Sequence, residues 1–221
     1  GLSQWISANR ADLSPANRWI LSRLQTATRR VEHGLAHFEL NESANALYEF
    51  VWKELCDWYI EFSKIPLREG GKAREQSVYV LGYVLERTLR LLHPIKPFVT
   101  EELWQSLPWK QPANTPARLA AGKAALMTLM FQRFPEADPL MVDEGAEKTI
   151  AALQGVIEGI RTFRGENNLS PKTEFAVKFT TQDEAAAKLI EKHRSELMTL
   201  SRVTGFDRVT GSQSDLEAVL P

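Results

Sequence analysis

The sequence has little cysteine, no excess charge of either sign and no long hydrophobic run. Its single cysteine, Cys56, lies in an apolar helical pattern, which excludes an internal disulfide framework and argues against a cysteine-based zinc site. The 27 basic and 28 acidic side chains give a net charge of -1, so the chain as a whole does not attract nucleic acid or an acidic membrane. No stretch approaches the roughly 18 apolar residues of a membrane span, and residues 1–10 show no signal-peptide pattern. We therefore expect a cytoplasmic protein.

Apolar residues recur at every third or fourth position through the first half of the chain and predict a series of amphipathic helices. With 221 residues, 43% of them hydrophobic, the chain has enough material for a continuous core. In the first helix the apolar face runs from Ile20 to Phe38, and a second helix is expected from Asn41 to Lys64. The expected caps and breaks are, in order, Ser14–Pro15, Asn41, Gly70–Gly71, His93–Pro94 and Thr100.

The second half changes in composition. Residues 108–123 are rich in Pro, Ala and small polar residues and predict an exposed loop. Residues 125–134 are then expected to be extended, with a helical turn as the alternative. A long helix is expected from about Asp143 to Gly165. Alternating apolar residues at 175–179 predict a strand, followed by a helix over 183–200 and a second short strand over 206–209. The predicted fold is mainly α, with a helical bundle over residues 1–135 (loop about 108–124) and a connecting helix and small α/β subdomain over 136–221.

Catalytic motifs are absent. His33 and His37 have the i, i+4 spacing that a divalent metal uses, but no adjacent glutamate completes a metalloprotease motif, and two exposed polar residues are the simpler interpretation. Residues 70–72 resemble the end of a phosphate-binding loop without its first glycine or its serine. Glu101 and Glu102 point about 100° apart on a helix and cannot flank one bond as a catalytic pair. We expect the chain by itself to hold no cofactor or metal and to be inactive as an enzyme.

The clearest charge asymmetry lies between residues 10 and 30. This stretch contains five arginines and a single acid, Asp12, and the arginines avoid the apolar face of the predicted helix. Arginine suits RNA because its planar guanidinium holds phosphates and base edges and stacks on unpaired bases. Composition alone leaves an alternative open, in which the patch is a solvated face with Arg29 and Arg30 paired to nearby glutamates.

The helix expected over residues 41–64 is unusually aromatic. Trp58 and Phe62 fall on its apolar stripe and are expected in the core. Trp52 and Tyr59 lie off the centre of the stripe and are better candidates for the surface, although helical spacing still favours packing for Trp52.

Three successive segments carry a resemblance to a known family: Asn17–Leu24 (NRWILSRL), Leu47–Glu61 (LYEFVWKELCDWYIE) and Leu91–Trp104 (LLHPIKPFVTEELW). In order and spacing they resemble the anticodon-binding domain of the valyl-tRNA synthetases. The first and third are shared loosely with isoleucyl and leucyl relatives, whereas the second is specifically valyl-like. A weaker segment, Ile160–Pro171, resembles the helix and turn that lead into that family's small mixed subdomain. The loop over 108–123 is longer than is usual in the family.

The resemblance implies a class I synthetase anticodon-binding helical bundle followed by a small α/β subdomain. The parent protein would be a valine-tRNA ligase that attaches valine to tRNA(Val) with ATP and Mg²⁺. The expected partners are the tRNA(Val) anticodon loop and the catalytic domain of the same parent chain. No membrane contact is expected, and the protein is expected to be monomeric. The residues expected to contact RNA are Arg18, Arg23, Arg29, Arg30, Trp52, Lys53 and Asp57.

Other interpretations remain at this point. A helical adaptor that binds a protein through the 108–123 loop or an apolar face explains an arginine patch without RNA affinity. The equivalent domain of an isoleucyl-tRNA synthetase is a second alternative. A free-standing all-α enzyme is the least favoured, because the nucleophile, metal and phosphate motifs are missing.

Overall fold

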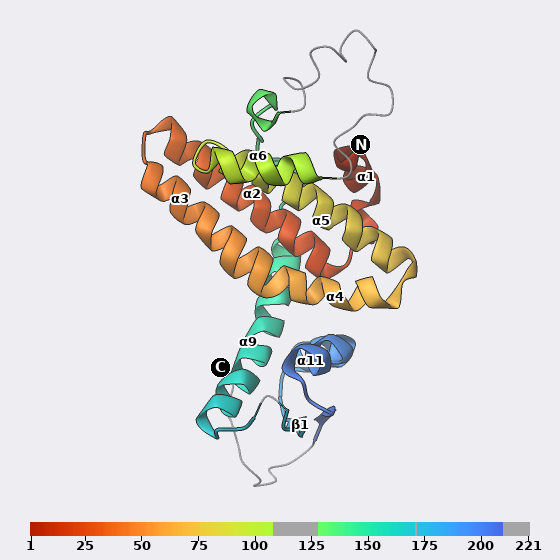
Figure 1. The fold of residues 1–221 in the computed structure, drawn as a ribbon. Coiled ribbons are helices and arrows are strands. Elements are labelled where there is room, and N and C mark those ends of the chain that lie inside the picture. Colours follow the sequence, from red (N-terminus) through yellow and green to blue (C-terminus); the bar gives the residue numbers. More distant parts are fainter. Residues whose placement is uncertain (108–127, 171, 210–221) are drawn as a thin grey trace. The chain divides into compact units, whose positions relative to one another are not determined.

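A computed structural model describes residues 1–107, 128–170 and 172–209 of the chain. Its contacts divide the chain into two compact units, Gly1–Asp143 and Glu144–Pro221, so the division falls after Asp143 rather than at the expected residue 135. The described part of the first unit is helical, and the second adds a small two-stranded sheet (Figure 1). The expected mainly α fold with a small α/β part is confirmed.

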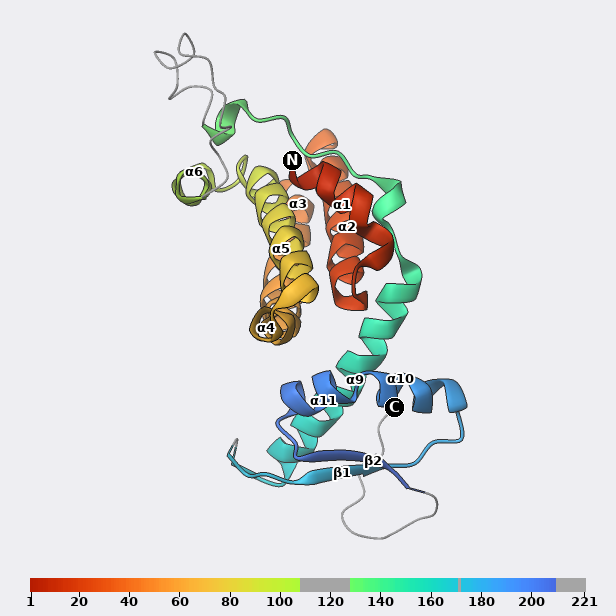
Figure 2. The same cartoon turned by 90° about the vertical axis from the view of Figure 1, so that its right-hand side faces the viewer.

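The first unit is a bundle in which α2, α3 and α5 lie side by side and α6 packs on α5 (Figure 2). The expected helices are all present, and short helical turns flank them. In chain order the elements are α1 (Leu2–Asn9), η1 (Arg10–Asp12), α2 (Pro15–Ala36), α3 (Leu40–Tyr48), η2 (Glu49–Tyr59), α4 (Ile60–Glu69), α5 (Gly71–Leu92), α6 (Pro97–Ser106), η3 (Leu129–Phe131) and η4 (Pro139–Met141).

Helix α2 begins as the sequence predicts. The Ser14 hydroxyl accepts a hydrogen bond from the backbone N–H of Asn17 at 3.3 Å, and Pro15 occupies the first helical position. Ile20, Leu24 and Val31 are buried along its inner face. Phe38, expected as the last residue of that face, is 90% exposed, because α2 ends at Ala36 and the chain turns away before Phe38 can reach the core.

The aromatic helix differs from its prediction in extent and in winding. It begins at Leu40, with Glu39 rather than Asn41 at the N-cap position, and it runs on through α4 to Glu69. Its middle segment, η2, is π-helical, and the N–H of Ile60, which follows η2, donates to the carbonyl of Leu55, five residues earlier. A π-turn contains more residues than an α-turn, so the inward face moves to later positions along this segment.

This change of winding decides which aromatic residues enter the core. Phe50, Leu55 and Tyr59 point inward, and Tyr59 donates a buried hydrogen bond to Asn17 Oδ1 at 2.8 Å. Trp52 is 58% exposed. Tyr59, a candidate for the surface, is therefore fully buried. Trp52 is at the surface, as its off-centre position indicated and against the packing that its helical spacing favoured.

Close contact between α2 and α3 depends on Gly34. A Cβ atom at this position would lie 2.3 Å from Ser43 Oγ and 2.9 Å from the carbonyl oxygen of Glu39. The absence of a side chain lets Ser43 donate to the Val31 carbonyl at 3.2 Å across the helix pair. The glycine that weakens α2 locally is thus required for its packing.

The start of α6 differs from its prediction because Pro97, not Thr100, initiates the helix. Proline at the first helical position has a suitable φ and needs no N–H partner there. Thr100 lies one turn inside and is buried, and its hydroxyl donates to the Lys96 carbonyl at 2.8 Å. His93 Nδ1 lies 2.8 Å from the same hydroxyl, which links the end of α5 to α6.

Glu101 has a structural role beyond the helix start. Its Oε2 accepts hydrogen bonds from the N–H of Leu129 at 2.8 Å and the hydroxyl of Thr128 at 2.9 Å, so α6 holds the returning chain at η3. Burial alone would raise the pKa of Glu101, but hydrogen bonds from Gln105, Leu129 and Thr128 hold it below its usual value. The short η3 turn is the alternative that the sequence left open here, and Thr128 and Gln132 on either side of it are extended. The predicted loop at 108–124 lies outside the described residues.

The segment after η3 runs along α2 and explains why the first unit extends to Asp143. Gln25 Oε1 accepts from the N–H of Asp138 at 2.9 Å, and the Ser22 hydroxyl oxygen accepts from the N–H of Asp143 at 3.0 Å. Arg10 donates to the Val142 carbonyl at 3.1 Å. These polar groups lie on separated turns of α2 and on η1, so sequence patterning gave no sign of them.

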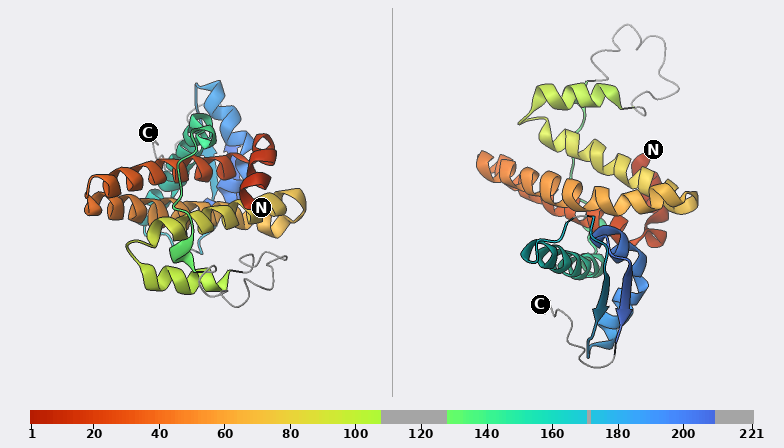
Figure 3. Two further views of the ribbon diagram at one scale, coloured as in Figure 1. Left: turned by 90° about the horizontal axis from the view of Figure 1, so that it is seen from above. Right: turned by 60° about the horizontal axis from the view of Figure 1, so that its bottom comes forward.

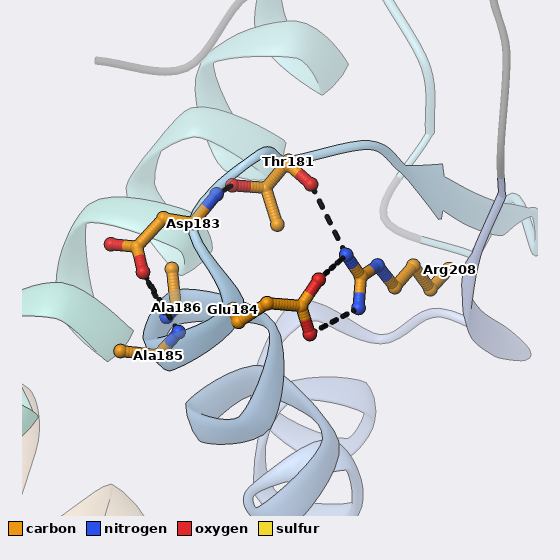
Figure 4. Close-up of polar contacts among 6 residues, drawn as sticks. All are labelled: Thr181, Asp183, Glu184, Ala185, Ala186 and Arg208. Atoms are coloured by element: carbon orange, nitrogen blue, oxygen red, sulfur yellow. Dashed lines mark hydrogen bonds and ion pairs between the residues drawn. The ribbon is translucent and has the colours of Figure 1, made fainter.

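The second unit confirms two predicted strands and divides one predicted helix. Its elements are α9 (Glu144–Glu166), β1 (Ala176–Phe179), α10 (Glu184–Lys192), α11 (Arg194–Ser201) and β2 (Gly205–Arg208). The strands are parallel, with Ala176 opposite Gly205 (Figure 3). The helix expected over 183–200 breaks at His193, which separates α10 from α11. Asp183 caps α10 by accepting from the N–H groups of Ala185 and Ala186 (Figure 4).

Two arginines hold the second unit together. Arg164 is 9% exposed and donates to four carbonyl oxygens, two in the chain after α9 and two at the end of α11. Its guanidinium carbon lies 4.4 Å from the ring centre of Phe175. Arg208 on β2 forms a two-pronged ion pair with Glu184 at the start of α10 (Figure 4). The hydrogen bond and charge of Arg208 lower the pKa of Glu184.

Candidate RNA-binding surface

Two of the candidate arginines connect α2 to η2. Arg23 contacts Glu54 Oε1 through Nε at 2.9 Å and Nη2 at 2.8 Å, and Arg30 contacts Glu49 Oε2 at 2.6 Å. The hydrogen bond from Arg30 lowers the pKa of Glu49 more than burial raises it. Both bridges lie near the surface, where a pair contributes about 0–1 kcal/mol, so they fix side-chain positions more than they stabilise the fold.

Arg18 faces the end of the first unit. Its Nη1 lies 3.5 Å from Asp143 Oδ2, with side-chain exposures of 34% and 21%, and its Nε is buried without a hydrogen-bond partner in the structure. Asp143 also donates its N–H to Ser22. Arg18 therefore anchors the last residue of this unit on α2.

Arg29 differs from the other three arginines. It is exposed, and it forms no ion pair or hydrogen bond with any residue in the described ranges. Its neighbour Arg30 is held by Glu49, and because consecutive helical residues point about 100° apart, Arg29 lies on a different face of α2 from this bridge. Of the arginine candidates, Arg29 is the one whose guanidinium is available to a ligand.

The η2 candidates lie on the outer side of their helix. Trp52 stacks on Tyr48 with ring centres 6.4 Å apart and an angle of 5° between the rings, and the two side chains are 58% and 59% exposed. Lys53 and Asp57 are also exposed. The structure thus brings a flat aromatic pair and a lysine together on one exposed helix, close to the Arg30–Glu49 bridge.

Sequence reasoning missed the exposed end of α2. His33 and His37, considered there only as metal ligands, stack with ring centres 4.1 Å apart. No group of three or more potential metal-binding side chains occurs in the described residues, and none of the helices described is long and apolar enough to cross a membrane. The missed signal was the i, i+4, i+8 spacing of Arg29, His33 and His37, which places three side chains in one row.

Comparison with known proteins places this surface in context. A family model described as the anticodon-binding domain of tRNA ligase matches residues 17–180. The chain belongs to this family. The match includes all three segments singled out in the sequence, Asn17–Leu24, Leu47–Glu61 and Leu91–Trp104, and it extends through β1.

This anticodon-binding domain is similar to several valine–tRNA ligases. It is 39% identical to that of Geobacter sulfurreducens over 94% of the chain, 42% identical to that of Pseudothermotoga lettingae over 73%, and 36% identical to that of Syntrophotalea carbinolica over 98%. These matches cover 22%, 17% and 24% of the respective relatives. The domain therefore spans about a fifth of the length of the curated relatives it matches.

Within an anticodon-binding domain, the candidate residues fall into two groups. Arg18, Arg23 and Arg30 are held by carboxylates of the domain itself. Arg29, Trp52, Lys53 and Asp57 are exposed. An unpaired guanidinium and an exposed aromatic pair can hold a phosphate and the face of an unpaired base, which are the groups that a single-stranded RNA loop presents.

Proposed function

We propose that this domain binds the anticodon stem-loop of tRNA(Val) as part of a valine-tRNA ligase. The parent enzyme would attach valine to that tRNA with ATP and Mg²⁺, and the chemistry would reside outside the 221 residues of this chain. Family membership and the similarity to valine–tRNA ligases support the class of RNA. The structural observation that carries the proposal is the exposed Tyr48–Trp52 pair with Lys53 beside it, together with Arg29 on α2, which is exposed and unpaired among the described residues.

The charge distribution of the chain favours attraction of RNA by a few local cations rather than by the net charge of the whole domain. A net charge of -1 provides no long-range steering, so affinity has to arise from a few cations placed beside stacking surfaces. Bases in an RNA loop are unstacked and stack on aromatic or guanidinium planes. On this reasoning Arg29 holds a phosphate, Trp52 offers a base platform, and Arg23 and Arg30 support the surface from within.

The test compares RNA binding by the purified chain with two arginine variants. The wild type should bind tRNA(Val) at low salt more tightly than the same tRNA with a changed anticodon, in a fluorescence titration. Arg29→Ala should weaken binding and reduce the slope of log K against log salt by about 0.7, as expected for one lost phosphate contact. Arg23→Ala is the matched control, because Arg23 is held by Glu54 and its loss should leave that slope unchanged. Equal binding of both tRNAs would refute specific recognition, and preference for an isoleucine tRNA would favour the isoleucyl alternative.

A second candidate function is supported by α6. Phe98, Val99 and Leu103 are 90%, 54% and 49% exposed on this one helix, an apolar surface suited to a protein partner. Within the proposed parent, this partner is the catalytic part of the same polypeptide. The helical adaptor would be supported instead if the chain showed no RNA affinity but bound a protein, and if Phe98→Ser on α6 abolished that binding.

A further inference from the structure

The exposed end of α2 carries a row of planar side chains. Arg29, His33 and His37 are spaced by four residues, so they lie on one face of the last two turns, and Phe38 follows the helix directly. All four are exposed. None of them contributes to the buried core of the first unit.

The two imidazoles form a fixed pair. Their ring centres are 4.1 Å apart and the rings are inclined by 24°. His37 Nδ1 lies 2.8 Å from the carbonyl oxygen of His33, and because a carbonyl only accepts, this nitrogen carries the proton. His33 Nδ1 lies 3.8 Å from Glu39 Oε2. The ring positions are thus set before any ligand arrives.

Phe38 has a backbone conformation that is uncommon for a residue other than glycine, and it closes the C-terminus of α2. Its φ is 60°, in the left-handed region where helices usually place glycine, and its side chain is 90% exposed. The backbone around it is fixed, since Glu39 N–H donates to the Gly34 carbonyl at 2.7 Å. A bulky apolar ring held in strained backbone and left in solvent is the pattern expected at a binding site.

The charges around the row favour a base over a phosphate. The C-terminus of a helix carries a partial negative charge, and Glu39 adds a carboxylate beside His33, so an anion is disfavoured at the ring end. Arg29 lies two turns earlier, about 12 Å along the helix axis from His37. It is therefore placed to hold the phosphate of a neighbouring nucleotide while a base covers the rings.

We propose that His37 and Phe38 form a stacking site for one unpaired base of the bound RNA loop, with His33 supporting His37 and Arg29 holding an adjacent phosphate. This inference rests on the proposed function, because the RNA is the anticodon stem-loop, but it locates the contact at the end of α2. These residues stand out only in the structure, and none of them lies in the aromatic helix by which the sequence resembles the family.

The test uses the purified chain and a tRNA(Val) anticodon stem-loop that carries the fluorescent base 2-aminopurine at one loop position at a time. Stacking on Phe38 should quench the probe at one position. Phe38→Ala should remove that quenching and weaken binding about fivefold or more, the loss expected for one base–aromatic stack. His33→Ala/His37→Ala should give a loss in the same direction.

Two controls distinguish a stacking site from a purely structural role of Phe38. Phe98→Ala is matched to Phe38→Ala, since both rings are 90% exposed, and it should leave binding and quenching unchanged. Phe38→Gly suits the left-handed backbone, so it should leave Tm unchanged or raise it while still weakening RNA binding. Reduced binding together with a lowered Tm would point to a structural role and overturn the proposal.

The remaining outcomes are also decisive. Wild-type binding of the stem-loop with unchanged affinity in Phe38→Ala would overturn the stacking site and leave the proposed function standing. No wild-type binding at all would reject both. Unchanged RNA affinity with altered self-association in Phe38→Ala would assign the ring to a protein contact instead.

Discussion

Substitution of Gly34 by alanine should destabilise the first unit, although the same change stabilises an ordinary helix. In the interior of an exposed helix, Gly→Ala gains about 1 kcal/mol from helix propensity. At Gly34 the new Cβ would lie 2.3 Å from Ser43 Oγ, 2.9 Å from the Glu39 carbonyl oxygen and 3.1 Å from the Ser43 nitrogen. Two of these three atoms belong to the backbone, so α2 and α3 have to separate.

The magnitude follows from the contacts that are lost. Overpacking of this kind costs about 1–3 kcal/mol. Separation of the helices also weakens the hydrogen bond from Ser43 to the Val31 carbonyl, which contributes about 1 kcal/mol. After subtraction of the propensity gain, Gly34→Ala should lower the free energy of unfolding by about 1–3 kcal/mol.

The assay is urea unfolding followed by tryptophan fluorescence. All six tryptophans precede residue 110, so this signal reports the first unit. Gly155→Ala in α9 is the control, because a Cβ there meets nothing within 4 Å, and it should stabilise its helix by about 1 kcal/mol as measured by circular dichroism. Adding Ser43→Ala to Gly34→Ala removes the closest contact and should recover part of the loss. A Gly34→Ala chain as stable as wild type, or strictly additive effects in the double variant, would refute the packing argument.

Three further predictions concern hydrogen-bonded polar groups. Tyr59→Phe leaves Asn17 Oδ1 without its buried donor and should cost about 1–3 kcal/mol by the same fluorescence assay. Arg164→Met removes the donor to four carbonyl oxygens and the contact with Phe175, and it should greatly accelerate hydrogen exchange in β1 and β2. The pKa of Glu101 is lower in the folded chain than its ordinary value of 4.5. The ionised carboxylate therefore stabilises the fold above pH 4.5, and this stabilisation is lost as the pH falls through the lower pKa of the folded chain. Glu101→Gln should therefore flatten the pH dependence of unfolding between about pH 5 and pH 3, and an unchanged profile would contradict the assignment.

The positions of most helices could be predicted because local signals determine them. The Ser14 cap and Pro15 mark the start of α2, and alternating apolar residues mark β1. The start of α6 was misjudged by four residues, since the N-cap position is Lys96 and not Thr100. Thr100 resembles a cap in sequence, but its hydroxyl in fact donates to the Lys96 carbonyl and lies beside His93 at the end of α5. Threonine at a helix start and threonine one turn inside give the same local pattern.

The candidate site was harder to predict because its composition depends on long-range partners. The arginine excess in α2 was visible, but Arg23 pairs with a glutamate 31 residues away and Arg30 with one 19 residues away. The open alternative, in which Arg29 and Arg30 were both paired, holds for Arg30 and not for Arg29 among the described residues. Phe38 was assigned to the core because its spacing continued the apolar face, and nothing in the sequence showed that α2 ends first.

The winding of η2 connects these corrections. In an α-helix Glu49 and Glu54, five residues apart, would point about 140° apart and could not both face α2. In the π-helical segment the hydrogen bonds span five residues rather than four and each turn holds more residues, which brings the two carboxylates to nearly the same side, opposite Arg30 and Arg23. The same winding turns Tyr59 inward and leaves Trp52 outside. The pairing of both Arg23 and Arg30 and the exposure of Trp52 are therefore consequences of one backbone feature. Because the 3.6-residue period describes α-helices only, sequence periodicity could identify the helix but not this surface.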